Sequence, residues 1–150
     1  MSIEKDIKQK HFKNPYNKVT VNVMFTNGWL LNEYAQILKP FNLTEQQYNV
    51  LKILRECHPR VATVNYILER MIDKMSNASR LVDKLVLKDL VKKFKSKYDL
   101  RSVDVILTEK GIKLMDELTN VIDEHEDSFI GLNEKETKLL NFLLEKLRNN

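Results

Sequence analysis

Residues 76–107 read SNASRLVDKLVLKDLVKKFKSKYDLRSVDVIL, and the spacing of the apolar residues changes within this stretch. In its first part the apolar residues fall on one arc of a helical wheel: Ala78, Leu81, Val82 and Leu85. This spacing predicts a helix over 76–88 with Ser76 as its N-cap. Residues 91–94 and 103–107 instead have the pattern of strands, joined by a polar stretch. We therefore expect one helix followed by a β-hairpin with a charged tip.

Two further helices are expected before this stretch. Thr44 and Gln47 can form a capping box, so a helix follows Thr44 and ends before Pro59. Thr63 is expected to open a short helix with four inward residues: Val64, Ile67, Leu68 and Met71. A short helix, a tight turn, a second helix and a two-stranded ribbon make a winged helix-turn-helix. The predicted fold class is mainly α, with the small β component of an α+β winged helix.

Long helices are expected on both sides of this winged helix-turn-helix. Residues 16–38 carry apolar side chains at helical spacing, and Pro40 is expected to stop this first helix. On the other side, Thr108 is expected to cap a helix over 109–129. Asn133 is then a favourable N-cap for a leucine-rich last helix.

Charge is unevenly distributed along the chain. The formal net charge is only +4, but residues 74–101 hold nine basic and three acidic residues, and 102–150 hold six basic and eleven acidic. A basic segment beside an acidic one indicates that one face meets an anionic partner, and double-stranded DNA is the expected one. The alternative is a set of solvated surface lysines.

The outward face of the 76–88 helix suits a recognition helix that enters a major groove. Small polar side chains at its start allow close approach, and Arg80 can form a bidentate pair with guanine. The expected contacts from this helix are Ser76, Asn77, Ser79, Arg80 and Lys84. The alternative is a solvated face on a packed helix, and the basic hairpin that follows counts against it.

The hairpin supplies a second group of expected DNA contacts, which are Lys93, Lys95, Lys97, Asp99 and Arg101. Asp99 stands two residues before Arg101, where its carboxylate can hold the guanidinium at the hairpin tip. An arginine held in this way can enter a minor groove, where the negative potential is enhanced. Further phosphate contacts are expected from Thr63, Asn65 and Lys74.

Four short sequence motifs follow one another along the chain: LTEQQYNVLKIL from Leu43, SNASRLVDKL from Ser76, the tip Asp99-Leu100-Arg101, and LTEKG from Leu107. In this order and spacing they resemble the multiple antibiotic resistance regulator (MarR) family of bacterial transcription factors, over about residues 16–147. The resemblance implies a single MarR-like domain over 1–150. It also implies a homodimer on a pseudo-palindromic operator, with half-sites about 10 bp apart.

In that family the first and last helices interlock between subunits. The resemblance therefore implies dimerisation regions at 16–39 and 109–148, and a winged helix-turn-helix DNA-binding region at 43–108. A two-fold dimer would bury the apolar surface of these helices. By the same resemblance, the residues expected from the 76–88 helix match recognition positions, and Arg101 matches the wing arginine. Two positions depart from the pattern: Asp89 stands where the family usually has Gly, and Leu100 replaces one of two basic residues.

Family members often sense a small aromatic ligand, and six residues are candidates for a pocket: Phe25, Trp29, Tyr34, Tyr48, Met71 and Met75. Such a set at helical spacing is more often plain core, which is the favoured alternative. The single cysteine, Cys57, stands near Arg55 and Arg60, and basic neighbours favour a reactive thiolate. We expect a structural thiol instead.

Other functional classes lack support in the sequence. No catalytic constellation, metal-ligand spacing or cofactor motif is present, so neither an enzyme nor a bound metal or cofactor is expected. No apolar stretch approaches the roughly 18 residues of a membrane span, and a cytoplasmic location is expected. We predict a transcriptional regulator that acts as a repressor and is relieved by a small aromatic ligand. The alternative is a winged-helix protein-interaction module without specific DNA binding.

Overall fold

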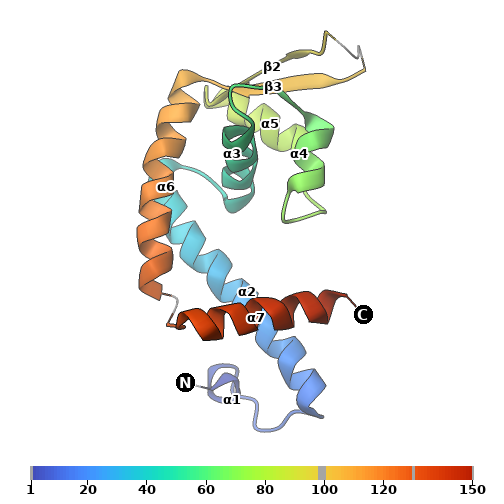
Figure 1. Ribbon diagram of the computed structural model, residues 1–150, viewed down its shortest axis with the longest axis vertical. Helices are drawn as coiled ribbons and strands as arrows, with labels where there is room; N and C mark the ends of the chain where they lie inside the picture. Colours follow the sequence, from blue (N-terminus) through green and yellow to red (C-terminus); the bar gives the residue numbers. More distant parts are fainter. Residues whose placement is uncertain (1, 98–100, 130, 150) are drawn as a thin grey trace. The chain divides into compact units, whose positions relative to one another are not determined.

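The winged helix-turn-helix expected from the sequence is present. The computed structural model describes residues 2–97, 101–129 and 131–149. Three helices and a small sheet form this part, and Figure 1 shows the helices gathered along one side of the strands β2 and β3. Their bounds are α3 Glu45–Cys57, α4 Val64–Arg70, α5 Ala78–Leu87, β2 Val91–Lys95 and β3 Val103–Leu107. These bounds agree with the expected helices and hairpin to within one or two residues.

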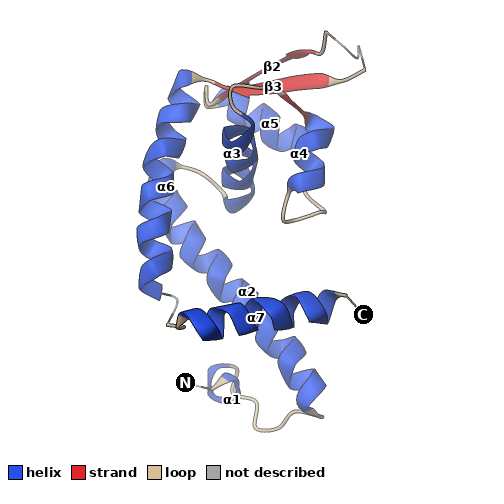
Figure 2. Ribbon diagram, viewed as in Figure 1, coloured by secondary structure: helices blue, strands red, loops and turns tan. Residues whose placement is uncertain are grey.

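A third strand, β1 (Ala62–Thr63), was not expected from the sequence. It pairs with β3, so the antiparallel sheet has the order β1-β3-β2 (Figure 2). In this register Ala62 stands opposite Val105. Two residues are too few to show an alternating pattern, which is why the periodicity could not identify this strand.

Local side-chain caps begin most of these helices. The capping box between Thr44 and Gln47 is present, and the Tyr66 amide donates to the Thr63 hydroxyl at 3.1 Å. Ser76, however, was wrongly expected to cap α5. The Ser76 hydroxyl donates to Asp73 Oδ2 at 3.0 Å, and Asn77 is the N-cap, accepting from the Arg80 amide at 3.0 Å. Asp73 engages Ser76, and the N-cap lies one residue later than predicted.

The core of the winged helix-turn-helix lies between its three helices and the sheet. Its fully buried side chains include Leu51, Ile67, Leu85 and Val105, one from each packed element. Leu68, which was expected to face inward, is instead 37% exposed. The seven-residue α4 turns one narrow face to the core, and Ile67 and Met71 occupy it at a spacing of four residues.

The turn that ends α5 has the left-handed conformation that usually requires glycine. Asp89 has φ 57°, and it stands at the position where the MarR family usually has Gly. The Leu90 amide donates to the Leu85 carbonyl at 3.1 Å, and the Asp89 amide donates to the Val86 carbonyl at 2.9 Å. This pair of bonds is a Schellman motif, which satisfies the last carbonyls of the helix.

The start of α6 (Glu109–Phe129) is bonded to this turn. The Thr108 hydroxyl donates to the Asp89 carbonyl at 2.7 Å, and the Gly111 amide donates back to that hydroxyl at 3.0 Å. A Cβ atom at Gly111 would lie 2.1 Å from the carbonyl oxygen of Leu90. The glycine of the LTEKG string therefore allows two backbones to pack in contact.

The long N-terminal helix α2 (Pro15–Leu38) is capped by Asn14 and buries only Leu38. After Leu38 the chain continues as the 3-10 turn η1 (Lys39–Phe41), so Pro40 ends the helix as expected. The four-residue α1 (Ile3–Asp6) was not expected. Large apolar side chains of α2 that are exposed in the single chain include Tyr16, Val19, Met24, Phe25, Trp29 and Leu31.

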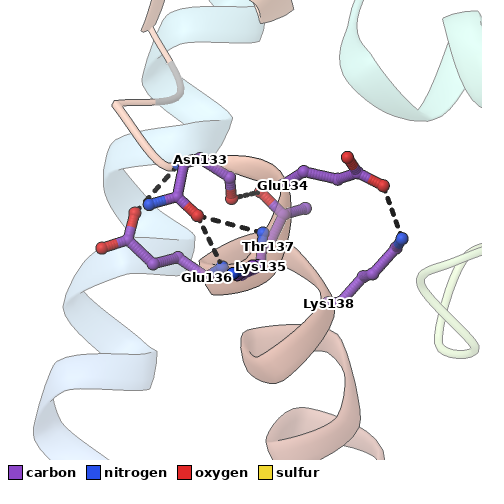
Figure 3. Close-up of polar contacts among 6 residues, drawn as sticks. All are labelled: Asn133, Glu134, Lys135, Glu136, Thr137 and Lys138. Atoms are coloured by element: carbon purple, nitrogen blue, oxygen red, sulfur yellow. Dashed lines mark hydrogen bonds and ion pairs between the residues drawn. The ribbon is translucent and has the colours of Figure 1, made fainter.

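Residues Met1–Met115 form one compact unit and residues Asp116–Asn150 a second one. The second unit contains the later part of α6 and the last helix, α7 (Glu134–Arg148). Figure 3 shows the expected cap of α7, in which the amides of Lys135 and Glu136 donate to Asn133 Oδ1. The Asn133 amide donates back to Glu136 Oε2 at 2.9 Å.

None of the residues of α7 is buried in the single chain. Its exposed apolar side chains are Leu139, Leu140, Phe142, Leu143 and Leu147. Among the described residues, no helix is long and apolar enough to cross a membrane.

Candidate nucleic-acid interface

The outward face of α5 presents three of the five expected recognition residues. Ser79, Arg80 and Lys84 are exposed. The other two residues make local hydrogen bonds, because Asn77 caps the helix and Ser76 is half-buried against Asp73. Ser79, Arg80 and Lys84 are therefore the expected contacts whose side chains are exposed and take no part in capping the helix.

Leu87 belongs to the same face, although it was not among the expected contacts. It follows Arg80 by seven residues, or two helical turns, and its side chain is 87% exposed. Met75, just before the helix, is 92% exposed. The helical period places Leu87 outward, so the sequence contained the signal for this residue. Apolar side chains on such a face can contact thymine methyl groups.

The wing is joined to the recognition helix by an ion pair. Lys93 Nζ on β2 bonds Asp83 Oδ1 on α5, and both side chains are about half exposed. Val91, Lys93 and Lys95 occupy alternate positions of β2 and therefore share one face of the strand. No local pattern predicts this pair, because the two residues lie on different elements.

The expected contacts of the wing are only partly described by the structure. Lys95 and Lys97 are exposed, and Arg101 is exposed on the opposite side of the hairpin tip. The Ser96 amide donates to the Ser102 carbonyl at 3.0 Å, which continues the ribbon towards this tip. Asp99 lies outside the described residues, so its expected pairing with Arg101 stays a prediction.

The three residues expected to contact phosphates lie at or after the start of α4. Thr63 is half-buried as the N-cap of this helix, and Asn65 is exposed in its first turn. Lys74 is exposed in the turn before α5, and its ammonium donates to the Glu69 carbonyl. Thr63 thus has a structural role in addition to the expected one.

The end of α4 and the end of the recognition helix are each bonded to a buried side chain of α3. Before α5, the Ile72 amide donates to Asn49 Oδ1 at 2.9 Å. After it, the Lys88 ammonium donates to Gln47 Oε1 at 3.0 Å and also bonds the Asn42 carbonyl. Burial, and then the nearby Lys84 ammonium, hold the pKa of Lys88 below its ordinary value. The Lys88 bonds hold the C-terminal end of α5 on α3, and the Ile72 bond holds the end of α4 there.

Of the six candidate pocket residues, the structure brings two together. Tyr34 of α2 and Tyr48 of α3, with ring centroids 6.4 Å apart, line a hollow of about 160 Å³. Met71 is core and Met75 is exposed, while Phe25 and Trp29 lie on α2 outside the lining. The hollow also contains Glu45, whose pKa is raised by burial and then by the Asp73 carboxylate.

Cys57 is a buried residue at the end of α3. The pKa of Tyr66 on α4 is raised, mainly by a hydrogen bond with the Cys57 side chain and to a smaller extent by burial. Burial among neighbouring elements is the environment expected for a structural thiol.

Comparisons with known proteins agree with this geometry. The family described as "Transcriptional regulator SarA/Rot" matches residues 32–118. The HTH-type transcriptional regulator MgrA of Staphylococcus aureus is 30% identical over 148 residues, which are 98% of this chain and 93% of MgrA. The multiple antibiotic resistance protein MarR of Escherichia coli is 30% identical over 120 residues, covering 79% of this chain and 80% of MarR.

Solved structures of the same fold include S. aureus MepR in complex with DNA. Its match has a TM-score of 0.75 and 26% identity, and covers 86% of this chain and 94% of the MepR chain. The fold, the order of the motifs and these relatives agree with one another. The chain therefore belongs to the SarA/Rot family of winged-helix transcriptional regulators, within the wider group of MarR-like proteins.

Proposed function

We propose that this regulator binds double-stranded DNA as a homodimer, at a pseudo-palindromic operator, and acts in the cytoplasm as a repressor rather than as an enzyme. The observation that carries the proposal is the accessible face of α5, where Ser79, Arg80 and Lys84 stand beside a basic wing. The similarity to MepR, which has been solved with DNA, supports it.

In this proposal α5 enters the major groove. Arg80 points outward from the first turn of the helix, where a guanidinium can donate to O6 and N7 of a guanine. Ser79 is small enough to allow close approach of the helix, and Lys84 lies one turn beyond Arg80. Asn65 and Lys74 would then contact backbone phosphates, which position the protein without reading the sequence.

The wing would contact the neighbouring minor groove through Lys95, Lys97 and Arg101. Lys93 has a different role here, because its ammonium is already paired with Asp83 on α5. We infer that this pair holds the wing against the recognition helix. The two DNA-contacting elements would then meet the duplex with a fixed spacing.

The exposed apolar faces of α2 and α7 support the dimer. Each helix leaves large apolar side chains uncovered in the single chain, and α7 buries none of its residues. On α7 the helical spacing places Leu139, Leu143 and Leu147 on one face, and an exposed apolar face is rarely left in water by a soluble protein. The regions 16–39 and 109–148 therefore remain the proposed dimerisation regions, and 43–108 the DNA-binding region.

The hollow beside Tyr34 and Tyr48 is the proposed effector site. Its volume of about 160 Å³ is close to that of apolar cavities that hold one aromatic ring. The lining contains an acidic group, Glu45, and an amide, Asn49, which can orient a phenolic hydroxyl. We infer a small aromatic effector with a hydrogen-bonding group.

Binding of the purified protein to the DNA upstream of its own gene tests the function. Fluorescence anisotropy would be recorded at low and high salt, with unrelated DNA as competitor. We expect affinity that survives the competitor and falls steeply with salt, since each phosphate contact contributes a slope of about −0.9 in log K against log salt. If that DNA is not bound, a random-library selection searches for the operator elsewhere.

A protein-interaction module is the second candidate function. It is favoured by Leu87, whose exposed apolar side chain lies on the same face of α5 as Arg80. A folded protein that selects no duplex from the library, and whose weak DNA binding shows no sequence preference, would support this candidate over the first.

A further inference from the structure

The turn that leads from α4 into the recognition helix exposes a large apolar side chain. Met75 is 92% exposed, and it stands two residues before Asn77, the N-cap of α5. Met75 was a candidate for the ligand pocket, but it does not line the hollow beside Tyr34 and Tyr48. Its side chain is instead accessible to a partner that meets the start of the recognition helix.

Several hydrogen bonds stabilise the backbone of this turn. Asp73 Oδ1 accepts from the Met75 amide at 2.9 Å, and Asp73 Oδ2 accepts from the Ser76 hydroxyl at 3.0 Å. The Ser76 amide donates to the Asp73 carbonyl at 3.2 Å, and the Ile72 amide donates to Asn49 of α3 at 2.9 Å. The backbone of Met75 is therefore anchored while its side chain stays exposed. Such an arrangement reduces the ordering that binding requires.

The polar neighbours of Met75 use their side chains within the turn itself. Ser76 donates to Asp73, Asn77 accepts from the Arg80 amide, and the Lys74 ammonium donates to the Glu69 carbonyl. Within the described stretch 73–77, Met75 is the residue whose side chain lies outside these bonds. Recognition helices place the residues at their N-terminal end against base edges. At this end of α5, Met75 is therefore the large side chain available for a base.

The major groove offers an apolar side chain one specific partner among the bases. Thymine carries a methyl group at C5 there, whereas adenine, guanine and cytosine present hydrogen-bond donors and acceptors. A methionine side chain is unbranched and polarisable, so it can adapt its shape to such a methyl group. An apolar contact of this kind favours thymine over the other three bases.

We propose that Met75 is a specificity-determining residue, which contacts the 5-methyl group of one thymine in each half-site. The inference rests on the proposed function, in which α5 enters the major groove. It adds a second base-reading residue to Arg80, which lies in the first turn of α5. Arg80 would select guanine through hydrogen bonds, and Met75 would select thymine through apolar contact.

Deoxyuridine substitution tests this contact, because deoxyuridine pairs as thymidine does but lacks the methyl group. Each thymine in one half-site of the operator is replaced in turn, and fluorescence anisotropy measures the Kd of the full-length protein. In the parent protein we expect one replacement to raise the Kd about fourfold, as for the loss of one buried methyl group. In Met75→Ala the Kd for the unmodified operator should rise, and the same replacement should have no further effect.

Two further variants separate base reading from a structural role. Met75→Leu keeps an apolar side chain and should keep the sensitivity to deoxyuridine, which a residue that only supports the turn would not control. Val61→Ala changes an apolar residue that is 41% exposed and lies outside the turn and α5, and it should leave both the Kd and the sensitivity unchanged. Thermal unfolding of all three variants checks that they are folded.

Two results would overturn the inference and leave the proposed function intact. One is an operator on which no deoxyuridine replacement weakens binding by the parent protein. The other is a sensitive thymine that remains equally sensitive in Met75→Ala. Failure of the proposed function gives a different result, because the parent protein would then select no operator from a random library. The inference would fall with the function in that case, and the exposed methionine would be left for a protein partner.

Discussion

Asp89 and Gly111 meet at the end of the recognition helix, and each is constrained by its backbone surroundings. Asp89 adopts a left-handed conformation with φ 57°, which L-residues with a Cβ atom enter with strain. Gly111 packs against the carbonyl of the next residue, Leu90. Arg80, by contrast, is exposed, so its guanidinium can donate hydrogen bonds to a binding partner.

Asp89→Gly should raise the free energy of unfolding by about 0.5–1 kcal/mol, because glycine removes the strain of the left-handed conformation but gains some unfolded-state entropy. Urea unfolding measures the change. Asp89→Ala is the matched control and should lower stability, since Ala enters this region less readily than Asp. Two variants that shift stability in the same direction would contradict this account of the turn.

Gly111→Ala should lower the free energy of unfolding by about 1–3 kcal/mol, the usual effect of forcing an extra methyl group into packed structure. The added Cβ would meet the Leu90 oxygen at 2.1 Å, so α6 or the turn must move. Gly131→Ala, with no atom within 4 Å of the added Cβ, should change stability by less than about 0.5 kcal/mol. Similar urea midpoints for the two variants would show that the close approach is unimportant.

Arg80→Ala should reduce operator affinity by about 1–3 kcal/mol and relax the preference at one base pair in each half-site. Anisotropy on the operator and on single-base variants measures both effects. Stability should be almost unchanged because the side chain is exposed. A uniform loss on every sequence would instead identify Arg80 as a phosphate contact.

The recognition helix is held by its neighbours as a single element. Its end is bonded to Gln47 through Lys88, and its side to the wing through the pair of Asp83 and Lys93, while the segment that leads to it from α4 is bonded to Asn49 through the Ile72 amide. The two bonds to α3 involve buried side chains and contribute to stability. The ion pair to the wing is half exposed, so its main effect is on position and charge.

Asp83→Asn should change the free energy of unfolding by less than about 1 kcal/mol, because exposed ion pairs contribute little. It should raise the affinity for unrelated duplex DNA and steepen its salt dependence, since a carboxylate is removed from the recognition face and Lys93 is released towards phosphates. Anisotropy with a non-specific duplex measures both quantities. Weaker binding to that duplex would mean that the positioning of the wing outweighs the gain in charge.

At the scale of the whole protein, two kinds of exposed surface suggest binding partners. One is the net positive segment from residue 74 to 101, which includes the recognition helix and the wing. The other consists of the large apolar side chains of α2 and of α7 that are exposed in the single chain. DNA and a second copy of the chain are the proposed partners of these surfaces.

Leu143→Lys in α7 should convert the proposed dimer to a species with the 17.7 kDa mass of one chain, because a charge would replace an apolar side chain in the proposed interface. Sedimentation at several concentrations measures the mass. Operator affinity should fall with it, since two linked half-site contacts become one. Glu145→Lys, at an exposed polar position of the same helix, should remain dimeric; a dimeric Leu143→Lys protein would remove α7 from the interface.

Most of the helices and the hairpin could be predicted from the sequence because their signals are local. Capping boxes at Thr44 and Asn133, the apolar arc of the recognition helix and the alternation in the wing all depend on residues within a few positions of one another. The four-residue helix α1 and the two-residue strand β1 were missed because such short elements show no period.

The contacts between elements were decided by the tertiary structure alone. Asp83 meets Lys93 across ten residues, and Lys88 meets Gln47 across forty-one. Of the six candidate pocket residues, only Tyr34 and Tyr48 line the same hollow. Helical and strand periods define which face a residue occupies, whereas its partner depends on which other face packs against it. Which faces pack together depends on how the whole core is buried. Nearby residues therefore determine the helices and strands, whereas the packing of these elements determines which residues form a site.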